Sequence, residues 1–282
     1  MPSPPAFIWI NGSVVATQDA RLSPLDHGFT VGDGVFETLT ARQSQVFALA
    51  RHWQRLAHAC QTLGIPVPEM NLMRTALTAV MRANELTEAR LRFTVTSGEG
   101  TPGSQPGNRP ATHIAMATDL PSWPATEKVI TVPWTRNENG ALAGLKCTSY
   151  AENIRALRAA SAAGAGEAVW GNTQGDLCEG SGSNIFVVIE GVIVTPPLSS
   201  GCLAGVTRAL VMEACLAAAL PFREGLVTMR EFGGVEEAFL TSSTRNVHVI
   251  AEIDGRSLKR APGALTQRAA NAFAEYASSV TD

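Results

Sequence analysis

The order of strand-like and helix-like segments is the feature that most constrains the fold of this chain. Apolar residues alternate with a period of two in several short segments and recur at helical spacing in others. The two kinds of segment mix without a strict strand–helix–strand rhythm, and no internal repeat interrupts them. The 282 residues can form one or two domains. We therefore expect a mixed α/β (α+β) fold in two lobes.

The first half is predicted to form a smaller N-terminal α/β domain over residues 1–118. Its segment FIWINGSVV is typical of a hairpin that turns at Asn11-Gly12, and a further strand is expected at Val35–Thr40. The segment ALARHWQRLAHACQTLGI has apolar residues at helical spacing and a stop at Gly64. A second helix over 69–84 and strands at Arg90–Thr96 and His113–Ala117 complete this half. A long Gly/Pro loop, TSGEGTPGSQPGNRP, joins these two strands and is of the kind that often borders a site.

A Pro-containing connector, DLPSWPATE, is expected to link the domains over residues 119–127. The larger domain would then occupy 128–282. Its expected strands are Val129–Val132, Ala168–Asn172, Asn184–Ile189, Val192–Thr195 and Glu237–Thr241. Its expected helices are Tyr150–Ala163, Val206–Ala218 and one that begins at Gly263.

Composition excludes several function classes. The formal net charge is −3 with no long run of one sign, which predicts neither a nucleic-acid surface nor a membrane patch. No apolar run approaches the ~20 residues that cross a bilayer, and the N-terminus lacks the basic region of a signal peptide. The five cysteines show no C-x-x-C spacing, so free thiols in a reducing cytoplasm are expected. No metal ligands are assigned.

Only three of the 22 basic residues are lysines. A lysine can become a nucleophile when its pKa falls, whereas arginine stays protonated. Lys128 opens a charged, Thr-rich strand and Lys259 lies in a polar turn, but Lys146 sits in the apolar segment AGLKCTSY, which can desolvate an ammonium group. A surface lysine with a buried stem is the alternative reading of Lys146.

A carboxylate and two candidate anion sites follow Lys146. Glu179 precedes a Gly/Ser turn and an apolar strand in LCEGSGSNIF, so a partly buried carboxylate in need of a cationic partner is expected there. A turn-capping glutamate is the alternative. The Gly-rich turn before Val206 leads into a helix whose first amides, with the hydroxyl of Thr207, would suit a phosphate. The cluster Ser242–Thr244 offers further hydroxyls.

In this order, the motifs DHGFTVGDGVFET, HWQRL, LK, CEGSGSNIF, LAGVTR and TSSTRNV resemble the class IV aminotransferases, the fold-type IV pyridoxal 5′-phosphate (PLP) enzymes. The resemblance runs nearly end to end. It implies a two-domain fold, a PLP cofactor and a homodimer in which the N-terminal segment of one subunit closes the active site of the other. The substrates would be a small amine or amino acid and a 2-oxo acid.

The resemblance also implies roles for individual residues. Lys146 matches the Schiff-base lysine, which would also shuttle the substrate proton, and Glu179 matches the carboxylate that holds the pyridine nitrogen protonated. Arg55 matches the arginine that holds the phosphate, and Leu203 matches the apolar residue packed on the ring. The other residues assigned to the cofactor are Tyr150, Ser183, Asn184, Val206, Thr207, Ser243 and Thr244. Tyr150 lies one residue closer to the lysine than the tyrosine of branched-chain members.

The substrate-binding positions depart from the best-known subgroups. Phe36 replaces the tyrosine of D-amino-acid aminotransferases, and the Arg-x-His pair of that group is missing after the Arg90–Thr96 strand. Thr38-Leu39-Thr40 replaces the Gly-Ile-Arg of branched-chain enzymes, and His27 replaces a common arginine. Arg90 and Arg92 point to the same face of one strand, so either could bind a substrate carboxylate or both could lie in solvent. His27 and Arg245 are further candidates.

Three functions are compatible with this sequence. The first is an aminotransferase acting on D-amino acids or (R)-amines. The second is 4-amino-4-deoxychorismate lyase, which releases pyruvate to give 4-aminobenzoate for folate synthesis. A PLP-binding protein without catalytic activity is the third, and the complete Lys/Glu/Arg set disfavours it. The sequence alone favours the aminotransferase.

Overall fold

The computed structural model of the chain describes residues 4–105 and 109–280, and it divides into two compact units. The first unit runs to Ser122 and also takes in Leu145–Tyr150, whereas the second comprises Trp123–Gly144 and Ala151–Val280. The sequence placed everything after residue 127 in one domain. In the structure, the Lys146 segment is grouped with the N-terminal unit instead.

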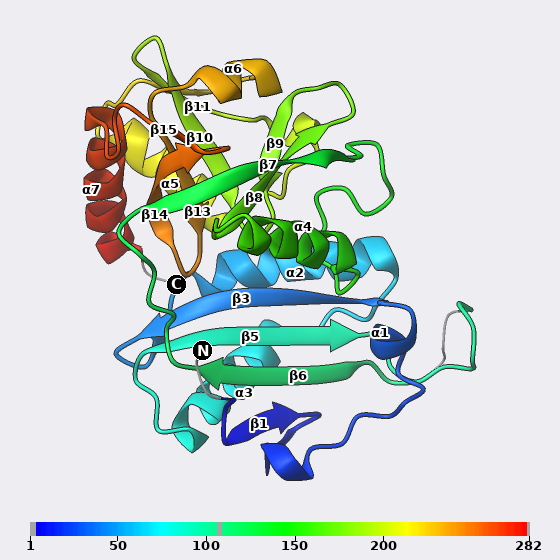
Figure 1. Cartoon of the computed structure of the whole chain (residues 1–282). Coiled ribbons are helices and arrows are strands. Elements are labelled where there is room, and N and C mark those ends of the chain that lie inside the picture. The colour runs from blue at the N-terminus through cyan, green and yellow to red at the C-terminus, as the bar shows by residue number, and fades with distance from the viewer. Residues whose placement is uncertain (1–3, 106–108, 281–282) are drawn as a thin grey trace. The chain divides into compact units, whose positions relative to one another are not determined.

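The first unit is built on a six-stranded sheet in the order β2-β1-β6-β5-β3-β4 (Figure 1). Its strands are β1 (Phe7–Ile10), β2 (Ser13–Ala16), β3 (Gly34–Arg42), β4 (Gln45–Val46), β5 (Ala89–Thr96) and β6 (Thr112–Thr118). Its helices are α1 (His27–Thr30), α2 (Leu49–Leu63) and α3 (Met70–Ala83), with a short 3-10 turn at Thr17–Asp19. The strands expected at the hairpin, 35–40, 90–96 and 113–117 and both long helices are confirmed within a few residues.

Local chemistry explains these elements. Asn11 and Gly12 both have positive φ angles (47° and 99°), as the tight turn of the β1–β2 hairpin requires. Helix α2 ends at Gly64, which adopts the left-handed conformation (φ 72°) that glycine tolerates best. Apolar residues of β3, β5 and β6 at odd-numbered positions pack on α2 and α3, including Leu39, Leu91 and Ala115. The even-numbered residues of these strands therefore face away from the helices.

The second unit is a nine-stranded mixed sheet (Figure 1). Its strand order is β12-β11-β10-β13-β14-β7-β8-β9, with β15 paired to β14. The strands are β7 (Glu127–Arg136), β8 (Glu167–Asn172), β9 (Leu177–Gly180), β10 (Asn184–Ile189), β11 (Val192–Thr195), β12 (Phe222–Glu224), β13 (Ala238–Ser242), β14 (Asn246–Ile253) and β15 (Arg256–Ser257). The helices are α4 (Ala151–Ala162), α5 (Val206–Ala217), α6 (Met229–Gly234) and α7 (Ala264–Ser279), with a 3-10 turn at Leu198–Ser200.

The expected helices of this unit and its strands at 168–172, 184–189, 192–195 and 237–241 are confirmed. The strand expected at Val129–Val132 is longer, because β7 continues to Arg136. Strands β9, β12, β14 and β15 and helix α6 were not expected. Within the described ranges, no helix combines the length and apolarity that crossing a membrane demands.

Candidate active site

Lys146 lies beside the first residues of β3. The N–H of Phe36 donates to the Lys146 carbonyl (3.0 Å), and the N–H of Thr148 donates to the Gly34 carbonyl (2.8 Å). This pairing places the Lys146 Nζ 4.6 Å from the centre of the Phe36 ring and 5.7 Å from that of Tyr150. The two rings pack edge to face, with centroids 5.2 Å apart. The Lys146 amine therefore has two aromatic neighbours, Phe36 and Tyr150.

Arg92 joins the same cluster from β5. Thr38 pairs with Arg92 in the sheet, which makes Phe36 and Arg92 diagonal neighbours on the face away from the helices. The Arg92 guanidinium stacks on the Phe36 ring, with Cζ 3.7 Å from its centre. Burial lowers the pKa of Arg92, an effect that the Tyr150 oxygen opposes and Arg90 adds to. A guanidinium and a lysine amine thus meet at one aromatic ring.

Arg90 is oriented differently. It pairs with Thr40, two residues further along β3 than Thr38, the partner of Arg92. Its Nε donates to the hydroxyl of Thr118 at 3.2 Å. Of the two arginines that the sequence left equivalent, Arg92 is the one in the Lys146 cluster.

Arg55 is held by a buried carboxylate that the sequence analysis did not single out. Its Nε and Nη2 donate to the two oxygens of Glu37, each at 2.7 Å, and His52 Nδ1 donates to Glu37 Oε2 at 2.6 Å. Glu37 is an odd-numbered residue of β3, so it faces α2, where His52 and Arg55 are one turn apart. Burial alone would raise the pKa of Glu37, but Arg55 and His52 together lower it to about 2. Burial also lowers the pKa of His52, which keeps its ring neutral.

We expect Glu37→Gln to destabilise the protein by about 3 kcal/mol at neutral pH, because it leaves the Arg55 charge without its buried partner. The pKa of Glu37 is lowered from 4.5 to about 2, so its ionisation stabilises the fold above pH 4.5, and this contribution is lost as the pH falls toward 2. Denaturant unfolding at several pH values measures both effects. The exposed carboxylate of Glu88 in the same unit offers the matched control Glu88→Gln. Equal pH profiles for Glu37→Gln and the wild type would contradict this account.

Glu179 lies on β9 in the second unit. It pairs with Trp170 of β8, and its Oε2 accepts the backbone N–H of Leu203 at 2.9 Å. Arg136, which the sequence analysis did not assign, lies over the Trp170 ring with its Nε 3.4 Å from Glu179 Oε1. The Glu179 side chain is only 12% exposed, as expected for a carboxylate that needs a cationic partner.

The turn after Leu203 forms a candidate phosphate site at the start of α5. Gly205 is the N-cap of this helix and carries no capping side chain, so the helix start offers backbone amides to an anion. A Cβ at Gly205 would overlap the Asn184 side chain, whose Nδ2 donates to the Leu203 carbonyl at 2.8 Å. Asn184 therefore shapes this turn through Leu203. Val206 and Thr207 are the first residues of α5, and both are buried.

Ser243 and Thr244 lie at the turn between β13 and β14, where Ser242 pairs with Asn246. Both are partly buried. Ser183 is not open to a ligand in the same way: it is 8% exposed, and its hydroxyl donates to Glu167 Oε2 at 3.2 Å. Its assignment to the cofactor stays a prediction, and the contact shown is a structural one.

Two residues that the sequence offered as donors to a substrate carboxylate, His27 and Arg245, have partners within the protein. His27 at the start of α1 is 2% exposed, and its Nε2 faces the Thr101 carbonyl at 3.1 Å. A Cβ at Gly100 would overlap the same ring, so His27 packs closely against the loop after β5. Three residues of that loop, 106–108, lie outside the described part of the chain. The Arg245 side chain is 4% exposed and forms ion pairs with two glutamates in the second unit.

These groups match the chemistry of PLP. An amine among aromatic rings can form an imine, and a partly buried carboxylate can hold a pyridinium. A helix start without a capping side chain, with Thr207 beside it, offers donors to a phosphate. Arg136 Nε is a buried donor that makes no hydrogen bond among the described residues. Its contact with Glu179 is an ion pair, so Glu179 lies beside a positive charge.

Comparisons with known proteins agree with this reading. The family model for class IV amino-transferases matches residues 34–253. The chain belongs to the class IV aminotransferase family. A protein of Methanocaldococcus jannaschii, named provisionally as a branched-chain-amino-acid aminotransferase, is 32% identical over 94% of each chain. A D-alanine aminotransferase of Bacillus licheniformis is 27% identical over 94% of this chain and 95% of its own.

Solved structures show the same fold. The branched-chain aminotransferase of Thermoproteus uzoniensis, determined with norvaline, has a TM-score of 0.89 and 28% identity, with 97% of this chain and 95% of that chain covered. The expected mixed α+β, fold-type IV architecture is therefore confirmed. Enzymes of the class IV family depend on PLP, so this chain is a PLP-dependent aminotransferase.

Proposed function

We propose that this enzyme transfers the amino group of an amino acid with an apolar side chain to a 2-oxo acid, with Lys146 as its Schiff-base lysine. The observation that carries the proposal is the meeting of Lys146 and Arg92 at Phe36. An amino acid substrate presents an amine and a carboxylate close together. Lys146 would exchange with the amine, Arg92 would bind the carboxylate, and the aromatic rings would contact an apolar side chain.

The other residues have distinct tasks in this proposal. Bound PLP supplies an electron sink for the charge left at Cα when its proton leaves. Lys146, once neutral, would take the proton from the substrate Cα and return it to C4′ of the cofactor, as the family resemblance implies. Glu179 keeps the pyridine nitrogen protonated, and the Leu203 amide fixes the direction of its carboxylate. Arg55, oriented by Glu37, is assigned to the phosphate, and the family resemblance assigns Thr207, Ser243 and Thr244 to it as well.

A branched-chain amino acid is the substrate class that we favour, because several similar proteins carry that name. The D-amino acid or (R)-amine favoured by the sequence analysis is the second candidate, and proteins named D-alanine aminotransferase support it. The lyase reading rests on the motif resemblance, since a solved structure bearing that name is 22% identical and shows the fold alone. A homodimer is part of the proposal as well, and a cytoplasmic location stays a prediction.

A substrate panel tests this proposal. Purified enzyme is given L-leucine, L-valine, D-alanine or (R)-1-phenylethylamine with 2-oxoglutarate, and separately aminodeoxychorismate. Glutamate formed from a branched-chain amino acid is the expected result. Glutamate from D-alanine or the amine alone would establish the second candidate. Release of pyruvate and 4-aminobenzoate without any glutamate would overturn the aminotransferase proposal.

Arg92→Leu is expected to raise KM for the amino acid and for the 2-oxo acid by about 10- to 100-fold, the range for losing one hydrogen-bonded charge. The contact is remote from Cα, so kcat should change much less. Arg90→Leu is the matched control, because Arg90 lies on the same strand face but bonds to Thr118. Steady-state kinetics of both variants measure the difference. Equal KM increases in the two would mean that Arg92 does not bind the carboxylate.

A further inference from the structure

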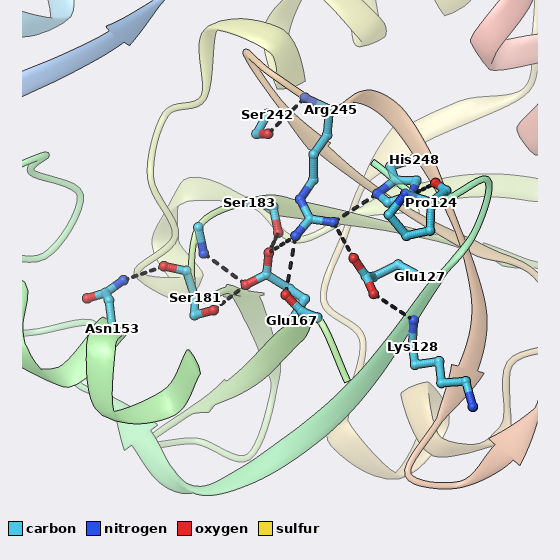
Figure 2. Close-up of polar contacts among 12 residues, drawn as sticks. Pro124, Glu127, Lys128, Asn153, Glu167, Ser181, Ser183, Ser242, Arg245 and His248 are labelled. Carbon is cyan, nitrogen blue, oxygen red and sulfur yellow. Dashed lines mark hydrogen bonds and ion pairs between the residues drawn. The ribbon is translucent and has the colours of Figure 1, made fainter. Parts of the chain in front are cut away.

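The second unit contains a buried ion network around Arg245 (Figure 2). The Arg245 Nη1 donates to Glu127 Oε2 at 2.7 Å, and its Nη2 lies 3.4 Å from Glu167 Oε2. The three side chains are between 3% and 7% exposed. The guanidinium also stacks on Trp123, with Cζ 3.7 Å from the ring centre. Both terminal nitrogens of the guanidinium thus have protein partners, and one of its faces lies on an aromatic ring.

His248 completes the surroundings of Arg245. Its Nε2 faces the Pro124 carbonyl at 2.8 Å, and a carbonyl can only accept, so Nε2 carries the hydrogen. Nδ1 then accepts from Arg245 Nη1 at 2.8 Å. Burial lowers the pKa of His248, in keeping with this neutral ring. The network therefore joins one arginine, two glutamates and a neutral histidine. Burial raises the pKa of Glu167, and Arg245 together with the hydrogen bonds from Ser181, Gly182 and Ser183 opposes that shift.

Glu167 extends the network to the turn after Glu179. Its Oε1 accepts the hydroxyl of Ser181 and the N–H of Gly182 (3.0 Å), and its Oε2 accepts the hydroxyl of Ser183 (Figure 2). Three consecutive residues of this turn thus donate hydrogen bonds to the Glu167 carboxylate. The turn is also held from outside, because Asn153 Nδ2 donates to the Ser181 carbonyl at 2.7 Å.

Two glycines permit this close packing. A Cβ at Gly166 would overlap the Glu127 carboxylate, and a Cβ at Gly180 would overlap the Ser183 hydroxyl. At its other end, Arg245 follows directly on Ser243 and Thr244, and its backbone N–H lies 3.3 Å from the Ser242 hydroxyl. One side chain thus ties the turn of Ser243 and Thr244 to the turn that follows Glu179.

We propose that Arg245 is a positioning residue, whose ion pairs with Glu127 and Glu167 hold the Ser243–Thr244 turn in the conformation that binds the cofactor phosphate. The inference rests on the proposed function, which assigns these two hydroxyls to the phosphate. Burying three charges costs free energy that an apolar cluster would not, so stability alone is a weak reason for this arrangement. A guanidinium with fixed partners does give its neighbouring turn a single orientation.

The test compares PLP with pyridoxal, which can form the same imine but lacks the phosphate. Arg245→Met removes the charge and keeps most of the length, Arg245→Lys keeps the charge, and Glu167→Gln removes one partner. Dissociation constants are measured from the visible band of the lysine-bound cofactor, and melting temperatures of the apoproteins from circular dichroism. Glu237→Gln is the matched control, because Glu237 is equally buried in this unit but accepts from Thr266 at the start of α7.

For Arg245→Met, we expect the dissociation constant of PLP to rise about 10- to 100-fold and that of pyridoxal less than about 3-fold. Glu167→Gln should show a smaller loss with the same selectivity, and Arg245→Lys should recover part of the affinity. Glu237→Gln should lower the melting temperature and leave the ratio of the two constants unchanged.

Equal losses for PLP and pyridoxal, or unchanged PLP binding in Arg245→Met, would overturn the positioning role. If Arg245→Met fails to fold, the same comparison in Arg245→Lys and Glu167→Gln decides. Wild-type protein that forms no visible band with PLP would overturn the proposed function as well. If the wild type forms the visible band with PLP but the variants lose affinity for PLP and pyridoxal equally, this inference alone is overturned.

Discussion

Lys146→Ala is expected to abolish the visible absorbance of the bound cofactor and to reduce turnover by at least ~10⁴-fold, the range for removing a catalytic nucleophile or base. The reason is that one amine has two tasks in the proposed reaction, as the attachment point of the cofactor and as the carrier of the substrate proton. Its Nζ lies 4.6 Å from the centre of the Phe36 ring and 5.7 Å from that of the Tyr150 ring, beside the aromatic cluster that Arg92 joins. Absorbance spectra and steady-state rates of the variant measure the two losses.

The other two lysines are the matched controls. Lys128 is 57% exposed and pairs with Glu252, and Lys259 is 74% exposed and pairs with Glu236. Lys128→Ala and Lys259→Ala should retain both the absorbance band and near wild-type turnover, because exposed ion pairs contribute little. Retained absorbance in Lys146→Ala, with loss in either control, would move the Schiff base to another residue.

Glu179→Gln should slow removal of the Cα proton by ~30- to 1000-fold while PLP stays bound. This range corresponds to losing one preorganised electrostatic partner, about 2–4 kcal/mol of transition-state stabilisation. A neutral amide cannot keep the pyridine nitrogen protonated, whereas the phosphate contacts do not involve this residue. Deuterium exchange at Cα of the substrate, followed by NMR, measures the step directly.

Glu152→Gln controls for the effect on Arg136. Glu152 is the second carboxylate beside Arg136, with Oε2 3.3 Å from its Nη1, but its side chain is 72% exposed. Removing this charge should leave the exchange rate close to that of the wild type. A near-normal exchange rate in Glu179→Gln would mean that Glu179 serves the β9 turn rather than the cofactor.

Much of the fold follows from local patterns in the sequence. Asn11-Gly12 gives the hairpin because both positions adopt positive φ, and the apolar spacing of 49–63 gives α2 because one face meets the sheet. Strands β10 and β11 have the predicted bounds, because each is a short, mostly apolar run between turns. In each case, residues close in sequence determine the structure.

The missed strands are short, or they are strands only because a partner strand pairs with them. Strand β9 has four residues beside a Gly/Ser turn, and it becomes a strand by pairing with β8 across Trp170 and Glu179. Strand β14 lies between β13 and the parallel strand β7, which is more than a hundred residues earlier. Pairing of the Lys146 segment with β3 is equally remote in sequence, so no local pattern reveals it.

In the candidate site, too, some residues can be predicted from the sequence and others cannot. Lys146 and Glu179 stand out in the sequence because their chemistry is unusual for their surroundings. The contacts that orient neighbouring groups do not stand out, because the clamp of Glu37 on Arg55 depends on a strand facing a helix. Alternation along β3 could have shown that Glu37 faces inward, and its burial would then have required a cation. Arg245, a candidate substrate ligand by sequence, instead has its partners within the second unit.

Chemical trapping of the cofactor tests the central claim most directly. Holoenzyme is reduced with borohydride, which converts an imine to a stable secondary amine, and is then digested and mapped by mass spectrometry. The account predicts a phosphopyridoxyl group on the peptide that contains Lys146 and none on those that contain Lys128 or Lys259. A modified Lys128 or Lys259, or no modified lysine in protein that carries PLP, would contradict it.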